Sequence, residues 1–495
     1  MNARADLGTL EASGLIQLAV IQPELEYLFR HALVQDAAYS SLLKQDRRSL
    51  HELAAEALLA MYPDRGRELA AVIAMHFDQA GDARRAAEQF VIAGEHALER
   101  FATREAVHAF ARALELMPAD DPDLDLRMRA AIGVARSGWT FMGLGGAIDQ
   151  LERALSVGAD RAERRLVADA YFWLAFLLRM SGETPQSSPR MQVALEQAEK
   201  IGTEVGDPAA HAIPKAFIGA GAMFSGELRK GAQLLSEALE AMLGRSDPLS
   251  TALLSGFLAI TYSRLGEFGA AENTLERSRP IADQGDEIAR LDQMIARSAL
   301  LLERGDIQEG SLLASQCASS SEELGAVACG VASNVLLGQA RLILEDPSGA
   351  KAPLERGLEL SVVTYMAAMR TLGKGMLGSA KARLGDLSGG EAGWNAALAD
   401  ASGMNDRYGE AQTLWARART RMRQREPDHQ AALADLEVAL PLFVTMEARP
   451  SIARISRDRA QALRALGRSD EAAEAERRAR ELATELGLKD FNLIA

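Results

Sequence analysis

The chain has 495 residues, a formal net charge of −14 at pH 7, and 48% hydrophobic but only 5% aromatic residues. This length exceeds what one ordinary domain core absorbs, so we expect either several domains or one array whose core grows by repetition. The acidic balance argues against a nucleic acid or an anionic membrane as the main partner, because both require a positive face.

The number of cysteines and the length of the apolar runs indicate the cellular compartment of the protein. Cys317 and Cys329 are too few for a disulfide framework and lack a metal-ligand spacing, so we expect buried fillers in a reducing compartment. Residues 1–14 contain no apolar run behind a basic start, and the longest apolar stretch, 171–178, is far too short to span a membrane. We therefore expect a cytoplasmic protein without a membrane partner.

The first eighty residues differ from the rest of the chain. A short helix through Leu10 ends at Ser13-Gly14, and two β-like runs, 15–20 and 25–29, then flank the turn 22–24. This order predicts a helix followed by a β-hairpin within residues 1–30. Residues 31–80 predict junction helices, and residues 81–495 form the third predicted segment.

A pattern of small residues repeats at intervals of roughly forty residues along this third segment. Each small residue is followed four positions later by another side chain, usually large and apolar, and seven positions later by a second small one. These three positions share one stripe of a helix. The pattern starts at Ala106, Ala147, Ser187, Gly231, Ala271, Gly310, Ala350, Gly390, Ala432 and Ala472.

A second series of small residues lies twelve positions before these starts and marks a first helix in each unit. Its members are Gly94, Ala135, Ala175, Gly219, Ala259, Ser298, Gly338, Gly378, Thr420 and Ala460. Six turn glycines separate the two helices of a unit, namely Gly182, Gly226, Gly266, Gly305, Gly385 and Gly467. Because glycine closes a helix and a polar residue opens the next, the pattern predicts an all-α solenoid of about ten helix pairs. An irregular helical bundle is the alternative.

This repeat resembles the tetratricopeptide family, in which small residues occupy the same three places and a tyrosine follows the first of them. Ala259, Tyr262, Gly266, Ala271 and Leu275 match the family pattern closely. The family's unit is shorter, and other side chains replace the tyrosine at Leu178, Leu301, Arg341 and Lys381. The resemblance implies a superhelix with lengthened helices, whose first helices face a concave surface.

The stretch 29–39, with Leu50-His51, His76-Phe77 and Ala80-Gly81-Asp82, resembles a junction in large bacterial regulatory ATPases of the STAND or AAA type. Some of these are linked to class III adenylyl or guanylyl cyclases, and in them a winged-helix domain precedes helical repeats. The resemblance implies that residues 1–30 are a winged-helix remnant. It also implies a signalling ATPase, cyclase or transcription regulator as partner. The chain lacks the phosphate loop of the ATPase, because Gly373-Lys374 has neither the earlier glycine nor the following hydroxyl.

Aromatic and arginine side chains near the small residues of the first helices should face the concave surface. Such side chains are good anchors for a peptide or a helix. The predicted surface comprises Arg136, Trp139, Phe172, Phe176, Arg179, Met223, Trp415, Arg419 and Met422, with Ile260 and Leu302 beside them. Packing of long helices is the alternative explanation for the aromatic residues.

Five arginines alternate along one predicted helix, at positions 417, 419, 421, 423 and 425. Alternate positions spread around a helix and do not form one stripe. We therefore expect a solvated helix here, with a phosphate-binding surface as the alternative.

The residues point to binding and away from catalysis. The G-x-S-x-G and H-E-x-x-H motifs are absent, and the seven histidines are scattered. We expect no enzyme, no cofactor and no metal, but a scaffold or sensor module of a bacterial signalling system that binds peptide or protein segments on its concave surface. A small-molecule-sensing domain and a truncated relative of a cyclase-linked ATPase are the alternatives.

Overall fold

The computed structural model describes residues 3–20, 26–118, 121–184, 187–206, 208–243, 248–285, 287–364, 367 and 369–490. Two compact units make up the chain: residues 1–96 with 112–119, and residues 97–111 with 120–495. The described ranges hold 24 α-helices, one short 3-10 helix and one two-stranded sheet. None of these helices is both long and apolar enough to cross a membrane.

The first unit begins with the predicted helix and hairpin. After α1 (Ala3–Ala12), β1 (Ile16–Val20) pairs in antiparallel register with β2 (Glu26–Phe29), and Ile16 lies opposite Phe29. The predicted turn at 22–24 lies outside the described residues. The assignment of this segment as a winged-helix remnant stays a prediction.

The predicted junction helices follow in the same unit. They are α2 (Ala32–Ser41), α3 (Lys44–Met61), the 3-10 helix η1 (Pro63–Arg65) and α4 (Gly66–Ala80). Pro63 stops α3 because it cannot donate a backbone hydrogen bond to a helix interior. A small core joins α3 and α4 through Ala55, Ile73 and Phe77. The domain boundaries at residues 30 and 80 remain predictions.

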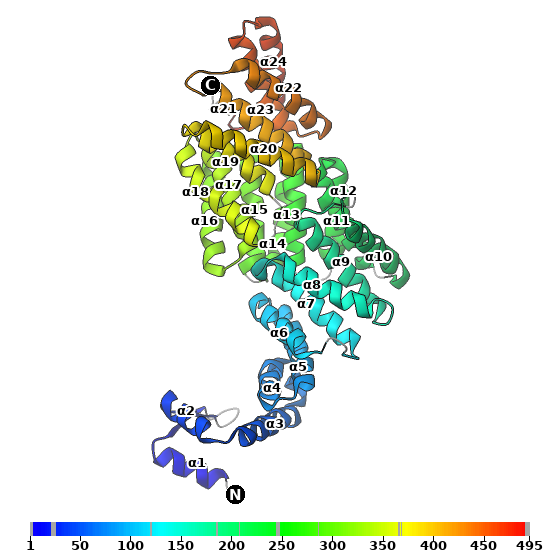
Figure 1. Ribbon diagram of the computed structural model, residues 1–495, viewed down its shortest axis with the longest axis vertical. Coiled ribbons are helices and arrows are strands. Elements are labelled where there is room, and N and C mark those ends of the chain that lie inside the picture. The colour runs from blue at the N-terminus through cyan, green and yellow to red at the C-terminus, as the bar shows by residue number, and fades with distance from the viewer. Residues whose placement is uncertain are drawn as a thin grey trace. The chain divides into compact units, whose positions relative to one another are not determined.

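From residue 83 the chain alternates between first and second helices (Figure 1). The first helices are α5 (Ala83–Glu99), α7 (Leu124–Met142), α9 (Arg164–Met180), α11 (Pro208–Ser225), α13 (Pro248–Leu265), α15 (Glu287–Arg304), α17 (Val327–Ile343), α19 (Arg370–Arg383), α21 (Arg407–Met422) and α23 (Arg449–Ala465). The second helices are α6 (Thr103–Leu116), α8 (Leu144–Gly158), α10 (Pro189–Val205), α12 (Leu228–Leu243), α14 (Phe268–Ala282), α16 (Ile307–Leu324), α18 (Pro347–Val363), α20 (Leu387–Met404), α22 (His429–Thr445) and α24 (Ser469–Leu486). The prediction of an all-α solenoid of about ten helix pairs is confirmed.

The small residues lie where the two helices of a pair cross. The Ser298 hydroxyl on α15 donates a hydrogen bond of 2.9 Å to the Gly310 carbonyl on α16. A Cβ atom added to Gly378 would lie 2.9 Å from the Gly390 carbonyl oxygen, in the next helix of that pair. Larger side chains at these positions would force the helices apart, so the repeated pattern records how closely the helices approach.

The six turn glycines close their first helices as predicted. Each adopts a positive φ, between 77° at Gly467 and 100° at Gly182, in the left-handed region that glycine enters without a steric penalty. At one of them the amide of Gly266 donates to the carbonyl of Ser263, and the amide of Glu267 donates to that of Tyr262. These bonds satisfy carbonyls that the helix end leaves open.

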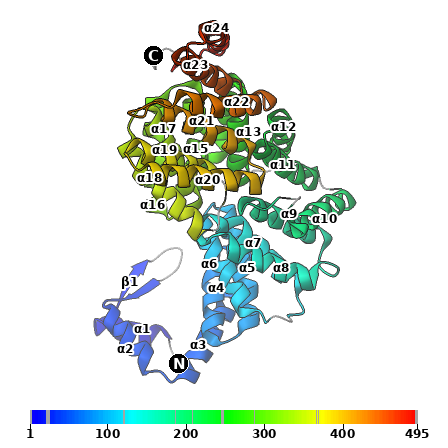
Figure 2. The same cartoon turned by 45° about the horizontal axis from the view of Figure 1, so that its top comes forward.

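In the second unit the stack of pairs turns back onto itself. Helix α7 contacts α17, α11 contacts α21, and α13 contacts α23, so one superhelical turn takes five pairs (Figures 1 and 2). The Leu144 amide donates to the Thr364 carbonyl at 3.0 Å, and the Ala367 amide donates to the Met180 carbonyl at 2.7 Å. Contacts between distant pairs therefore hold the turn closed.

We predict that one added methyl group at a helix crossing destabilises the second unit. A Cβ atom on Gly219 would lie 2.9 Å from Leu235 Cγ and 3.1 Å from its backbone nitrogen. Overpacking of this kind typically costs about 1–3 kcal/mol, so Gly219→Ala should lower the urea midpoint of unfolding.

Gly221→Ala is the matched control, because Gly221 lies on the same helix and has no atom within 4 Å of the added Cβ. It should be neutral or stabilise the helix by up to about 1 kcal/mol. Equal effects of the two substitutions would contradict the crossing geometry.

Candidate functional site

The first helices of the second unit surround a cavity of about 210 Å³, which we call the central cavity. Its walls come from α7, α9, α11, α13, α15, α17, α19, α21 and α23, with Met369, Arg423 and Asp490 added from helix ends and the C-terminal segment. Because the superhelical turn is closed, the concave faces of its first helices meet around this space.

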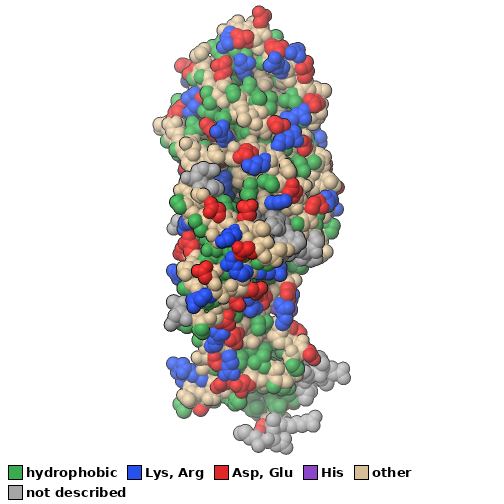
Figure 3. All heavy atoms as spheres, turned by 90° about the vertical axis from the view of Figure 1, so that its right-hand side faces the viewer, with side chains coloured by type: hydrophobic (Ala, Val, Ile, Leu, Met, Phe, Trp, Pro, Cys, Tyr) green, Lys and Arg blue, Asp and Glu red, His purple; other side chains and the backbone are tan. Residues whose placement is uncertain are grey.

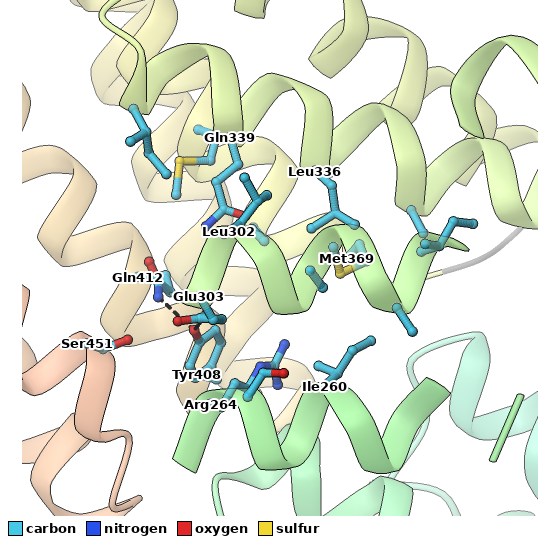
Figure 4. Close-up of a pocket in the computed structure, with 18 of the residues that line it drawn as sticks. Ile260, Arg264, Leu302, Glu303, Leu336, Gln339, Met369, Tyr408, Gln412 and Ser451 are labelled. Atoms are coloured by element: carbon cyan, nitrogen blue, oxygen red, sulfur yellow. Dashed lines mark hydrogen bonds between the residues drawn. The ribbon is translucent and has the colours of Figure 1, made fainter. Parts of the chain in front are cut away.

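Much of the cavity wall is apolar. Ile260, Leu302, Leu336 and Met369 face one another across it (Figure 4). Desolvated walls of this kind supply binding energy for apolar groups, whereas the few polar groups fix the orientation of a ligand. Two groups of polar residues lie near the ends of α21, and Asp292 and Gln339 add further polar atoms to the wall.

A hydrogen-bonded group lies near the start of α21, which we call the tyrosine end. The hydroxyl of Tyr408 donates to Glu303 Oε1 at 2.6 Å and accepts from Gln412 Nε2 at 2.9 Å (Figure 4). Burial raises the pKa of Tyr408 above its ordinary value, and the charge of Glu303 raises it further. Tyr408 therefore stays protonated and keeps its hydroxyl as a donor to Glu303.

Arg264 adds a buried cation to the tyrosine end. Its guanidinium carbon lies 3.8 Å from the centre of the Tyr408 ring, which is a close cation–π contact. The side chain is about nine-tenths buried. Among the described residues Arg264 Nη1 is buried and has no hydrogen-bond partner, so the wall contains an unsatisfied donor.

Arg454 of α23 crosses to α15 at the same end. It forms a bidentate pair with Asp490, at 2.8 and 3.0 Å, and donates to the carbonyl oxygen of Glu303 at 2.8 Å. Burial lowers the pKa of Arg454, but the Asp490 carboxylate more than offsets this and raises it overall. This pair fixes the C-terminal segment against the end of α15.

Four arginines lie around the other end of α21, and we call them the arginine cluster: Arg383, Arg419, Arg423 and Arg457. All four line the central cavity. This corrects part of the expectation of a solvated helix at 417–425, because the side chains of Arg419 and Arg423 are only 18% and 27% exposed, whereas Arg425, beyond the end of α21, is exposed. Positions 417 and 421 face the opposite way and pair with the buried Asp435.

A second cavity, of about 260 Å³, lies between α7, α9, α11 and α13. Phe172, Phe176 and Phe217 line it. The ring centre of Phe217 lies 4.6 Å from that of Phe172 and 5.2 Å from that of Phe176. Leu253 and Phe257 line both cavities, so the two spaces share a wall on α13.

The structure distributes the nine predicted surface residues among four environments. Trp139, Met223, Trp415 and Arg419 line the central cavity, and Arg136, Phe172 and Phe176 line the second one. Met422 packs in the core between helices. Arg179 donates to the Met404 carbonyl at 3.3 Å and joins α9 to the end of α20 across the superhelical turn. No ligand-binding role for any of them is tested by this placement.

Ile260 and Leu302 also line the central cavity, but the sequence analysis missed most of its polar residues. Arg264 and Glu303 lie five positions beyond the small residues Ala259 and Ser298, so their spacing carried a usable signal. The positions of Arg454 and Asp490 could not be predicted from spacing. Arg454 contacts Glu303, 151 residues away in the chain, and Asp490, 36 residues away.

Three glycines, Gly373, Gly375 and Gly378, match the spacing of a dinucleotide-binding loop. They lie inside α19 and not between a strand and a helix. A Cβ atom on Gly375 would lie 2.5 Å from the Thr413 hydroxyl. These glycines therefore allow close helix packing and do not form a phosphate loop.

Comparisons with known proteins agree with this fold. A Rap protein solved in complex with Competence and Sporulation Factor is 12% identical and covers 75% of this chain and 99% of its own, with a TM-score of 0.52. The Cut9–Hcn1 hetero-tetramer of the APC/C is 14% identical and covers 89% of this chain and 86% of its own, with a TM-score of 0.50. The fold is a tetratricopeptide-like α-solenoid.

Other comparisons do not identify a family for the chain. A STAND protein with a tetratricopeptide repeat sensor from Pyrococcus horikoshii covers 93% of this chain and 67% of its own at 11% identity. Its TM-score of 0.39 is too low to support the resemblance to regulatory ATPases. No model of a known protein family matches the chain, and no curated protein matches it.

We predict that Tyr408→Phe destabilises the protein by about 1–3 kcal/mol, because it removes a hydrogen bond from the largely buried Glu303 and Gln412. Urea unfolding at pH 8 measures the change. Tyr262→Phe is the control, since the Tyr262 hydroxyl makes no hydrogen bond to another described residue, and it should shift stability by less than about 0.5 kcal/mol.

The raised pKa of Tyr408 adds a pH dependence with a definite sign. Its stabilising effect is complete below the ordinary tyrosine pKa of about 10 and is lost as the pH rises above that value, because the unfolded chain ionises first. Between pH 10 and 11 the stability difference between the wild type and Tyr408→Phe should shrink. A difference that stays constant would contradict the assignment.

Proposed function

We propose that the chain is a non-catalytic binding module of a bacterial signalling system and that it holds a short peptide or protein segment in the central cavity. One observation carries this proposal. Nine first helices of the second unit contribute to one cavity with a largely apolar wall and charged or hydrogen-bonding groups at its ends.

The layout of this cavity suits an extended segment. The cavity-facing residues Tyr408, Gln412, Trp415, Arg419 and Arg423 follow one face of α21 from end to end, because their spacing stays close to three or four residues. Over fifteen residues a helix rises about 22 Å, the length of an extended segment of roughly six or seven residues, and a cavity of about 210 Å³ would enclose only part of such a segment. Apolar side chains of the segment would then pack between the two polar ends.

The comparison proteins add support at the level of the fold. The Rap protein was solved with Competence and Sporulation Factor and the Cut9 protein with Hcn1, so solenoids of this kind form complexes. By the resemblance in residues 29–82, the partner of this chain would be a signalling ATPase, a cyclase or a transcription regulator. The same resemblance supports a winged-helix remnant at 1–30, and the two cysteines fit a cytoplasmic location.

A small-molecule sensor is the second candidate function. The central cavity is largely apolar and has converging polar groups, including the unsatisfied donor of Arg264, and such pockets also suit metabolites. A metabolite would occupy part of the space that a peptide fills, so the two candidates predict different responses to a peptide library.

We predict that a displayed library of random seven-residue peptides enriches binders on the wild-type protein and that Ile260→Trp abolishes the enrichment. Ile260 lines the central cavity, so a larger ring there fills the space that the ligand needs. Ile218→Trp is the matched control, because Ile218 is 41% exposed and lines neither cavity. It should retain the enriched peptides.

Thiol labelling locates the binding. Cys329 lines the central cavity, whereas burial raises the pKa of Cys317 to about 12 and suppresses its thiolate. An enriched peptide should slow the reaction of Cys329 with methyl methanethiosulfonate. Failure of the library to enrich any peptide on the wild type, or enrichment that survives Ile260→Trp, would count against peptide binding in this cavity.

A further inference from the structure

The charge inside the central cavity has the opposite sign to the charge of the whole chain. Six arginines line it, at 264, 383, 419, 423, 454 and 457, against three carboxylates, Asp292, Glu303 and Asp490. The whole chain carries −14. On the face of the molecule drawn in Figure 3, basic and acidic side chains are interspersed.

The excess is concentrated in the arginine cluster. Among the described residues, Arg383, Arg419 and Arg423 share the carboxylate of Glu345, and Arg419 also lies near the carboxylate of Asp458, which pairs with Arg457. Within the described ranges, Arg383 makes the shortest of these ion pairs, 2.5 Å to Glu345. The closest approaches of Arg419 to Glu345 and Asp458 are both 3.7 Å, and Asp458 also accepts a 2.7 Å hydrogen bond from the Trp415 indole.

This arrangement is unfavourable without an anion. Burial lowers the pKa of Arg419, the charges of Arg423 and Arg457 lower it as well, and Asp458 and Glu345 only partly oppose the shift. Like charges brought together in a poorly solvated site repel each other. Favourable contact with the C-terminal end of α21 accounts for one or two of these cations but does not require four.

We propose that the arginine cluster binds an oxyanion, a carboxylate or a phosphate, carried by the ligand of the central cavity. Guanidinium groups form paired N–H donors that match the oxygens of both anions. The inference rests on the proposed function and names the chemistry of one end of the ligand. The apolar wall and the tyrosine end would hold the rest.

Thermal unfolding with simple anions tests the site without knowledge of the ligand. Citrate and pyrophosphate supply the two kinds of oxyanion, each compared with sodium chloride at equal ionic strength. At least one should raise the midpoint of wild-type unfolding by about 1–3 °C, as expected when a ligand binds only the folded state. Stabilisation by citrate alone assigns a carboxylate, and stabilisation by pyrophosphate alone assigns a phosphate.

The double variant Arg419→Gln/Arg423→Gln should lose this shift. The matched control is Arg477→Gln/Arg478→Gln on α24, whose side chains are 56% and 73% exposed and which removes the same charge. The control should keep the full shift. The single variant Arg423→Gln serves if the double variant unfolds, and at least half of the shift should be lost.

The variants also separate anion binding from a purely structural role. Without anions, Arg419→Gln/Arg423→Gln should unfold at the wild-type midpoint or above it, because repulsion is relieved. A lower midpoint would show that the arginines serve as structural partners of Glu345 and Asp458. Equal anion shifts in all three proteins, or none in any, would overturn the proposal.

Peptide selection distinguishes failure of this inference from failure of the proposed function. If the double variant enriches the same peptides as the wild type with unchanged affinity, peptide binding stands and the anion site is wrong. If binding weakens about 10-fold or more, and amidation or replacement of an acidic residue in the peptide weakens wild-type binding equally, the anion site is supported.

Discussion

The structure depends on how closely two helices can approach at one point in each pair. Glycine, alanine and serine at that crossing let the backbones come together, as at Ser298 and Gly310, where a side chain reaches the opposite carbonyl. Close crossings of the same kind recur along the series of pairs and give the stack its curvature. Because the curvature accumulates, the second unit completes a turn after five pairs and places distant first helices around a common space.

Closure of this turn has electrostatic consequences. Side chains that are far apart in the sequence meet inside it, as when Arg454 reaches the carbonyl of Glu303, 151 residues away. The side chains of Arg419 and Arg454 are only 18% and 9% exposed there, so each of these charges needs a nearby partner. The tyrosine end supplies such partners within the protein. Among the described residues the arginine cluster has fewer carboxylates than cations, so the two ends of the cavity differ in their balance of charge.

Local periodicity explains what could be predicted from the sequence. The helix pairs, the turn glycines and the inward position of residues such as Trp139 follow from spacing within about forty residues. The environment of Arg419 does not, because its neighbours Glu345 and Asp458 come from other pairs. The run of alternating arginines was therefore predicted to be solvated, although Arg419 is largely buried at the cavity and Arg417 and Arg421 pair with the buried Asp435. The roles of Tyr408 and Asp490 could not be predicted for the same reason, because their partners Glu303 and Arg454 also come from other pairs.

Closure of the superhelical turn is the central claim, and zero-length carbodiimide cross-linking with mass spectrometry tests it most directly. Lys489 Nζ lies 2.7 Å from Asp306 Oδ1, 183 residues away in the sequence, and the two meet only if the turn closes. The adjacent-helix pair Lys215–Glu237, at 2.6 Å, is the internal control. The account predicts both isopeptide links in the native protein. A strong control link with no link between Lys489 and Asp306 would contradict it.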